Sequence, residues 1–174
     1  MSNRAGLKLA REKLRPYALA GTHEAAIIID RATGEHLDFQ VGGAHEVTPA
    51  WEKIPAGAQV TVLHVHHTDI GPGPEDWDVV ALHRQIKGAE IVCPNVIFII
   101  EKPDAWLFQS QMKPGVSALG SVWLRVMNQV LKDGVVDKNG ATRVSAKWTT
   151  VEETNRRFLL TLFARDFILE MVSH

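Results

Sequence analysis

The sequence predicts an α+β fold in which one β-sheet is flanked by helices. Runs rich in β-branched and aliphatic residues at 22–30, 58–63 and 95–100 are typical of buried strands. Apolar residues at helical spacing in 4–15 and 118–132 indicate helices that can cover such a sheet. The chain has 174 residues, of which 45% are hydrophobic and 22% are charged, so it is long and apolar enough to bury its own core.

Composition and charge limit the classes of function. The formal net charge is −1, so nothing in the electrostatics points to a nucleic acid partner. Cys93 is the only cysteine, which excludes an intrachain disulfide and fits a reducing compartment. The apolar run at 96–100 is too short to cross a bilayer, and the Arg/Lys-rich first residues lack the pattern of a signal peptide. We therefore expect a cytoplasmic protein with no membrane partner.

Residues 1–19 are predicted to form an N-terminal helix that precedes the core. Leu7, Ala10 and Leu14 share one side of this helix. Pro16 is expected to end it, because proline lacks the backbone N–H that an interior helical position needs. The basic residues on its other sides are expected to form a solvated face.

Residues 20–110 are predicted to form the core. The isoleucine-rich strand at 22–30 and the alternating strand at 36–41 are separated by a turn that carries Gly34, which predicts a β-hairpin. Glu24 lies near the N-terminal end of the first of these strands. A carboxylate there is usually a surface residue, and it gains a catalytic role only if a metal-binding strand ends at the same edge of the sheet.

The loop from 42 to 57 is expected to hold a short helical turn at Trp51. Its residues His45 and Glu46 are an alternative ligand and an alternative acid, although their irregular spacing makes both weaker candidates. The next helix is expected to run from Pro74 to about residue 87 and to end at Gly88.

Residues 111–174 are predicted to form a C-terminal helical extension packed on the core. The helix at 118–132 has a wide apolar face, and 141–148 is expected to pair as a strand with 135–136. A capping box predicts a last helix from 151 to 172. Its apolar side is too wide for a lone surface helix, so we expect a homodimer or a partner-binding surface there. The expected interface residues are Phe158, Leu162, Phe163 and Phe167.

The residues with the strongest chemical signal follow the strand at 58–63. His64 and His66 are two apart, so on an extended strand they point to the same face. A Gly/Pro run then turns the chain, and Pro74 suits the first position of a helix. Asp78 lies one turn into that helix, from where it could return to the strand end. Two imidazoles and one carboxylate leave a coordination position for water, as in catalytic zinc sites.

The alternative interpretation of this stretch is a histidine-rich loop at a strand end, with Asp78 as a solvated helix residue. That interpretation suits a lone histidine. The combination of His-x-His on a strand, a Gly/Pro turn and acidic residues opening a helix favours a metal site.

These residues together resemble the motif of the JAB/MPN (JAMM) metallopeptidase family. The short segment with an Ile-Pro-x-Gly sequence at 54–57 before the histidine strand looks like compact bacterial or phage-borne members. The resemblance covers about residues 20–110 and implies a JAB/MPN-like sheet that binds zinc. By position, it implies that His64, His66 and Asp78 are the zinc ligands and that Glu24 activates a water. The implied function is a metallopeptidase or isopeptidase acting on a protein or peptide substrate.

The sequence departs from the family motif at two places. His67 stands where the family has a proline, and one extra residue in the Gly/Pro segment places Glu75 at the position of the serine that stabilises the oxyanion. Two other functions therefore stay open. One is an MPN-like scaffold or interaction module whose metal site has decayed. The other is a metal-dependent nuclease or toxin domain that uses the same triad with His67, although the charge lacks the basic track that phosphate binding needs.

Overall fold

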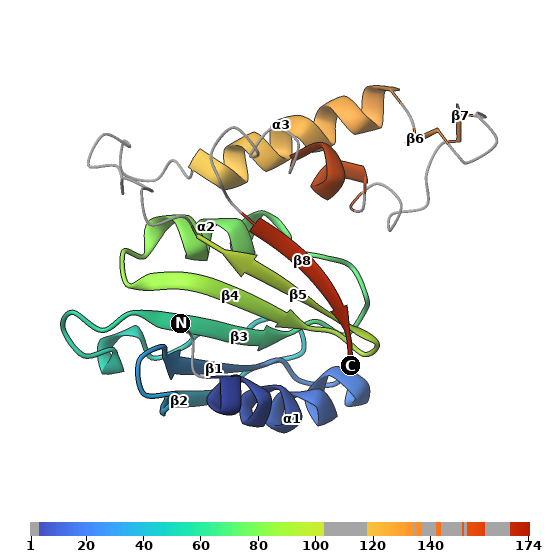
Figure 1. Cartoon of the computed structure of the whole chain (residues 1–174). Coiled ribbons are helices and arrows are strands. Elements are labelled where there is room, and N and C mark those ends of the chain that lie inside the picture. The colour runs from blue at the N-terminus through green and yellow to red at the C-terminus, as the bar shows by residue number, and fades with distance from the viewer. Residues whose placement is uncertain are drawn as a thin grey trace.

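The fold is of the α+β class and is built around one six-stranded mixed sheet, with α1 on one face and α2 and α3 on the other (Figure 1). The sheet has the strand order β2-β1-β3-β4-β5-β8. The computed structural model describes residues 4–102, 118–133, 135–136, 142–143, 151, 153–158 and 168–174.

Along the chain, the one unit of strand, α-helix and strand in the described sheet is β3, α2 and β4. The helices are α1 (Arg4–Ala20), the 3-10 turn η1 (Trp51–Lys53), α2 (Pro74–Leu82) and α3 (Ala118–Asp133). The strands of the sheet are β1 (Ala25–Asp30), β2 (His36–Val41), β3 (Val60–Val65), β4 (Ile86–Val92), β5 (Val96–Glu101) and β8 (Ile168–Ser173). A two-stranded ribbon pairs β6 (Val135–Val136) with β7 (Thr142–Arg143).

Only one strand pair in the sheet is parallel. β3 and β4 run in the same direction and are joined through α2, whereas all other neighbours are antiparallel. A parallel pair needs a crossover connection, so α2 is held across the sheet between the end of β3 and the start of β4. The predicted β-hairpin of β1 and β2 is confirmed.

Helix α1 covers one face of the sheet. Its buried side chains recur at helical spacing and contact alternate residues of β1 and β3, so each strand sends every second side chain into this layer. The cluster contains Leu7, Ala10, Leu14, Ala18, Ile27, Ile29, Leu63 and Val65. Gly6 is needed here because a Cβ would lie 2.3 Å from the carbonyl oxygen of Gly34 in the hairpin turn.

The prediction that Pro16 ends the first helix is wrong, because α1 continues through Pro16 to Ala20. Proline removes one helical hydrogen bond and costs about 3 kcal/mol in a helix interior. Packing of the last turn offsets that cost: Ala18 is buried in the α1 layer, and the Tyr17 ring lies 6.0 Å from the Phe39 ring, centroid to centroid.

The opposite face carries the larger core. Trp77 and Val80 of α2, Trp123 of α3 and Phe158 are buried in it. They pack on the strand residues Ile28, Val62, Ala89, Ile91 and Ile100. This layer sets the position of α2, and the candidate site lies along its edge.

Helix α2 is shorter than predicted and ends at Leu82 rather than near residue 87. Ile86 is already part of β4, where it is fully buried and pairs with Val60. Gly88 lies inside that strand rather than at a helix end, and a Cβ there would lie 2.8 Å from the Ile100 carbonyl oxygen. Ile86 is buried in the larger core, on the face of the sheet covered by α2 and α3, which explains why the strand begins early.

The predicted pairing of 141–148 with 135–136 is confirmed at Thr142–Arg143, but the prediction that the last helix runs from 151 to 172 is wrong at its end. Residues 168–173 form β8, which pairs with β5 along its whole length, so the C-terminal residues complete the main sheet. Helix α3 agrees with the prediction for 118–132. Phe158 is fully buried in its own chain, against Trp77 at 4.8 Å between ring centroids. The predicted interface residues Leu162, Phe163 and Phe167 lie outside the described residues.

None of the helices in the part of the chain that the structure describes has the length and hydropathy required to cross a membrane.

Candidate metal site

Strand β3 brings two histidines to one edge of the sheet. His64 lies in β3, and the His66 N–H donates to the Val92 carbonyl of β4 at 3.1 Å, which extends the ladder by one residue. Residues two apart on an extended chain face the same way, and the Nε2 atoms of both imidazoles approach Asp76 of α2. Leu63 and Val65 point into the α1 layer, and their burial fixes this register.

The segment between His66 and α2 is tied to neighbouring elements. The Asp69 carboxylate accepts hydrogen bonds from the Asn95 backbone N–H at 2.9 Å and from its side-chain amide at 2.6 Å. Gly71 lies so close to its surroundings that a Cβ would be 3.1 Å from Asn155 Nδ2 and 3.2 Å from Phe98 Cε1. These contacts fix where α2 begins relative to the two histidines.

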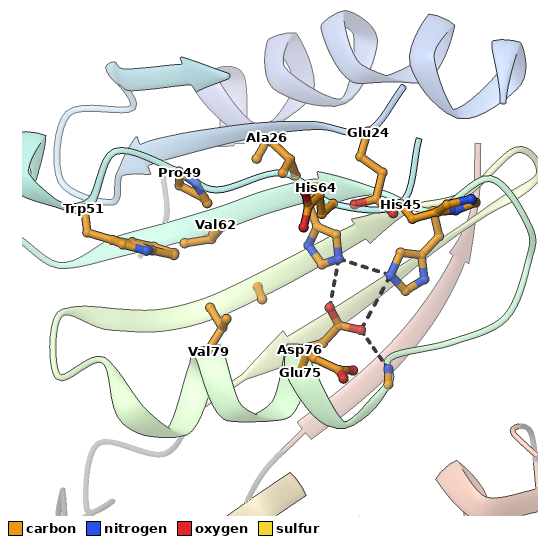
Figure 2. Close-up of a pocket in the computed structure, with 15 residues that line it drawn as sticks. Glu24, Ala26, His45, Pro49, Trp51, Val62, His64, Glu75, Asp76 and Val79 are labelled. Carbon is orange, nitrogen blue, oxygen red and sulfur yellow. Dashed lines mark hydrogen bonds and ion pairs between the residues drawn. The ribbon is translucent and has the colours of Figure 1, made fainter. Parts of the chain in front are cut away.

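Asp76 is the carboxylate that meets the imidazoles. It is the third residue of α2, and its Oδ2 accepts a hydrogen bond from the Gly73 N–H at 2.7 Å, the return half of a capping box. Its Oδ1 lies 2.9 Å from His64 Nε2, and its Oδ2 lies 3.6 Å from His66 Nε2 (Figure 2). The helix cap therefore turns this carboxylate toward the strand end.

The ligand atoms have the spacing that a small metal ion requires. The two Nε2 atoms are 3.2 Å apart, and the carboxylate distances lie on either side of that value. Tetrahedral bonds of about 2.0–2.1 Å place neighbouring ligand atoms about 3.3 Å apart. The group formed by His64, His66 and Asp76 could therefore hold a metal ion, and three ligands leave one tetrahedral position open.

A second hydrogen bond orients one imidazole. His66 Nδ1 lies 3.2 Å from the Ile70 carbonyl oxygen. Because a carbonyl oxygen only accepts, Nδ1 carries the proton, and the neutral ring keeps a lone pair on Nε2. Metal-binding histidines usually have such a partner on the nitrogen that does not bind the ion.

The charges of the site favour an anionic aspartate. Burial raises the pKa of Asp76, but His64, His66 and the Gly73 N–H outweigh burial and hold that pKa at about 2. Burial lowers the pKa of His64, whereas Asp76 and Glu24 raise it by more, so its net shift is upward. For His66, burial is the largest effect, and the pKa is lowered. An ionised carboxylate and a neutral imidazole are the forms that bind metal.

The structure places Asp76, and not Asp78, beside the histidines. Two residues correspond to about 200° around an α-helix, so Asp76 and Asp78 lie on opposite sides of α2. Asp78 Oδ1 instead accepts a hydrogen bond from the Gly120 N–H of α3 at 2.8 Å. The assignment of Asp78 as a metal ligand is therefore corrected to Asp76, and Asp78 links the two helices.

This correction also moves the position of the expected serine. Three residues before Asp76 is Gly73, so a Ser-x-x-Asp spacing counted from Asp76 places Gly73, not Glu75, at the serine position. Glu75 is exposed and lines the cavity next to Asp76. Its expected catalytic role rested on the alignment through Asp78, which the geometry does not support.

Glu24 reaches the same cavity from the neighbouring strand. Ala26 of β1 pairs with His64 of β3, and Glu24 lies two residues before Ala26, on the same face of the extended chain. Its side chain points toward His64 (Figure 2). Burial, helped by the charge of Asp76, raises the pKa of Glu24, although His64 and two other histidines oppose the shift. Glu24 is not among the three grouped ligands, so it lies beside the site without completing it.

The other candidate side chains surround the site. His67 follows the end of β3; its Nε2 lies 3.1 Å from the His23 carbonyl oxygen, and it is not one of the grouped ligands. His45 and Glu46 line the cavity from the loop after β2. That loop is fixed to Glu24, because the Glu24 N–H donates to Gly43 and the Glu24 carbonyl accepts from Gly42, each at 2.8 Å.

The ligand triad lies in a cavity of about 480 Å³ between the loop after β2, the sheet and α2. Figure 2 shows Glu24 and His45 at one end of it and Trp51 and Pro49 at the other. Between these ends the lining is formed by Ala26, Val62, Val79 and Ala89. The site is therefore open to a ligand and has a polar end and an apolar end.

Asp76 could have been identified from the helical periodicity of the sequence that forms α2. Glu75, Asp76 and Val79 lie on one side of α2 and line the cavity, whereas Trp77 and Val80 face the core. An acid at the third helical position, following a glycine N-cap, is also placed to point back toward the preceding segment. The family motif, aligned by its prolines, points to Asp78 instead.

Comparison of the chain with protein-family models, with curated proteins and with solved structures gives no match.

Proposed function

We propose that this protein is a zinc-dependent hydrolase of amide bonds in a protein or peptide substrate, similar to the JAMM metallopeptidases. The observation that carries the proposal is the convergence of His64 Nε2, His66 Nε2 and the Asp76 carboxylate in an open cavity that also contains Glu24. Three protein ligands and an open position are the usual composition of a catalytic zinc site, whereas structural sites are closed by a fourth ligand.

Zinc suits this donor set because it accepts imidazole nitrogen and carboxylate oxygen in tetrahedral geometry. His64, His66 and Asp76 would hold the ion. When bound, zinc supplies Lewis acidity that lowers the pKa of water and polarises a substrate carbonyl.

Glu24 is the proposed general base. Its carboxylate takes a proton from the attacking water and delivers it to the leaving amine as the amide bond breaks. Partial burial and the nearby Asp76 charge raise the pKa of Glu24, which makes it a better proton acceptor than a solvated glutamate. The paired backbone hydrogen bonds between Glu24 and residues 42–43 hold it in place.

The alternative of an inactive MPN-like scaffold is favoured by one observation. Gly73, at the serine position counted from Asp76, offers no side-chain donor for an oxyanion. Losing one such donor costs other hydrolases on the order of a hundredfold or more in turnover. The metal ligands and Glu24 have no use in a scaffold, so we prefer a slow hydrolase.

The first experiment tests the metal site with a matched pair of variants. Asp76→Asn should strongly weaken zinc binding, because a neutral amide is a poorer ligand than a carboxylate. Asp78→Asn makes the same chemical change on the opposite side of α2 and should retain zinc. Zinc per chain is measured by elemental analysis after reconstitution and dialysis. Equal zinc retention in the two variants, or no zinc in the wild-type protein, would contradict the proposal.

The second experiment tests the chemistry. Glu24→Gln should retain zinc and the fold but lower peptide hydrolysis by about a hundred- to ten-thousand-fold, the usual effect of removing a general base. Turnover is measured on a quenched fluorescent peptide library with zinc-loaded protein, and the cleaved bonds are assigned by mass spectrometry. Zinc binding without any hydrolysis by the wild-type protein would favour the scaffold alternative.

A further inference from the structure

The cavity extends well beyond the metal ligands, and that extension is apolar. Val62 and Ala89 form its floor on β3 and β4, and each is only 3% exposed. Val79 of α2 forms one wall, and Pro49 and Trp51 form the other (Figure 2). These side chains continue from His64 along the sheet, so a ligand held at the triad would place its next group against them.

The wall that contains Trp51 is built into the fold. The Trp51 indole stacks on the His83 ring, with 4.5 Å between centroids and 23° between planes. The adjacent Ala50 N–H donates to Asp38 Oδ2 at 2.9 Å, and Lys53 Nζ lies 2.6 Å from Asp38 Oδ1. Asp38 is itself buried in β2. The loop is therefore tied to the sheet on one side of Trp51 and to the end of α2 on the other.

We infer that this part of the cavity is a specificity subsite for an aliphatic side chain of the substrate, on the residue next to the scissile amide. The inference rests on the proposed function and adds the substrate class. Val62, Val79, Ala89 and Pro49 have hydrocarbon side chains, so a polar side chain placed against them would lose its hydration without gaining a partner.

Charge complementarity excludes one alternative occupant. Glu24, Glu46 and Glu75 line the cavity in addition to Asp76, so the lining carries several carboxylates. An acidic substrate side chain in this cavity would be repelled by their negative charge. An aliphatic residue such as leucine avoids this repulsion and fills the apolar end.

The experiment uses small ligands that bind through the metal and require no turnover. N-acetyl-leucine hydroxamate and N-acetyl-glycine hydroxamate differ only in the side chain that the subsite would accept. We expect zinc-loaded protein to bind the leucine compound at least tenfold more tightly in calorimetry, since a hydrophobic pocket discriminates about ten- to two-hundred-fold per missing group. An aspartate analogue should bind more weakly than the leucine compound.

A variant with an enlarged cavity distinguishes binding in a specific subsite from nonspecific binding of apolar side chains. Val79→Ala removes two methyl groups from the wall, so the ratio of phenylalanine to leucine hydroxamate affinity should rise by roughly tenfold. Leu124→Ala makes a comparable truncation on α3, where the side chain is 44% exposed and does not line the cavity. That control should keep the wild-type ratio.

The outcomes distinguish this inference from the proposed function. Side-chain preference in hydroxamate binding without any peptide hydrolysis would support the subsite and contradict the hydrolase. Peptide hydrolysis with equal affinities for the leucine and glycine compounds would contradict the subsite alone. Failure of both hydroxamates to bind the zinc-loaded protein, or an unchanged affinity ratio in Val79→Ala, would also overturn the subsite.

Discussion

At the scale of single residues, one carboxylate joins the helix cap to the metal site. Asp76 accepts the Gly73 N–H, which defines the start of α2, and it contacts both imidazoles. The negative charge also lies in the first turn of the helix, where the helix dipole favours it. The same hydrogen bond that begins the helix therefore positions the third ligand, and its distance from the histidines depends on where the helix starts.

Gly73→Ser tests the serine position of the family motif counted from Asp76, where this chain has a glycine. The backbone there is extended, with φ −92°, and a Cβ would meet only the Glu75 and Asp76 carboxylates, at 3.6 and 3.8 Å, so serine fits. A hydroxyl beside the triad can donate to an oxyanion, and we expect peptide turnover to rise by up to about a hundredfold.

Zinc content and thermal stability should stay at wild-type values in Gly73→Ser, because serine is a good N-cap residue. Gly43→Ser is the matched control on the loop, where a Cβ meets nothing closer than 4.0 Å, and it should leave turnover unchanged. A fall in turnover for Gly73→Ser, with zinc retained, would mean that the serine alignment through Asp76 is wrong.

The raised pKa of His64 predicts how zinc binding depends on pH. A raised pKa keeps the imidazole protonated to a higher pH than usual, and the protonated ring cannot bind metal. Zinc affinity should therefore decrease as the pH falls through the pKa of His64. Glu24 is one of the groups that raise this pKa, so Glu24→Gln should move the loss of affinity to lower pH.

This dependence is measured by competition with a chromophoric chelator between about pH 5 and 8, the range in which histidine titrates. A zinc-binding profile that is identical in the wild-type protein and in Glu24→Gln would mean that the Glu24 carboxylate does not act on His64 in solution.

At the scale of elements, each side of α2 makes a different kind of contact. Trp77 and Val80 pack into the core, Asp76 and Val79 line the cavity, and Asp78 holds the N–H of Gly120 at the start of α3. Because these positions are fixed relative to one another by the helix, the core contacts determine the orientation of the metal ligand and of the proposed subsite wall.

Local sequence predicts an element correctly where the spacing of its apolar side chains fits only a helix or only a strand. The isoleucine run of β1, the alternation in β2 and the His-x-His pair on β3 follow from side-chain periodicity alone. The sequence at 168–173 has apolar residues that suit a helix or a strand. Its pairing with the open edge of β5 decides the outcome, and this edge is about 70 residues away in the chain.

The resemblance to the family motif assigned Asp78 by position, and the structure replaces it with Asp76. Both acids follow the Gly/Pro run, and the spacing of the motif does not include the orientation of the helix. The direction in which α2 leaves Gly73 selects Asp76, and that direction depends on Trp77 and Val80 entering the core.

Phe158 allows a test of whether the last helical segment belongs to the core or to an interface. It is fully buried against Trp77, so Phe158→Ala should lower the free energy of unfolding by about 3–5 kcal/mol. The mass of the protein in light scattering should not change. Leu124→Ala, on the exposed side of α3, is expected to cost far less. A normal stability combined with a change in mass would instead support the interface predicted from the sequence.

At the scale of the whole molecule, the hydrophobic core lies apart from the metal ligands. The two hydrophobic clusters lie on opposite faces of the sheet and include none of the three ligands. The ligands meet at the edge of the sheet, where the His64 and His66 side chains are still 17% and 20% exposed. Without an ion, Asp76 keeps its contacts to His64 and to the Gly73 N–H, so the carboxylate still has polar partners.

Removal of the metal should therefore lower stability only by the binding free energy of the ion. With free zinc at a hundredfold excess over its Kd, binding adds about 2.7 kcal/mol, which corresponds to a Tm difference of roughly 5–10 °C for a chain of this length. Calorimetry of zinc-loaded and chelated protein measures this difference, and both forms should unfold cooperatively, with near-native circular dichroism before the transition. Loss of tertiary structure on chelation at room temperature would mean that the ion is part of the folding core, since a catalytic site built on a completed sheet can lose its metal without losing the sheet.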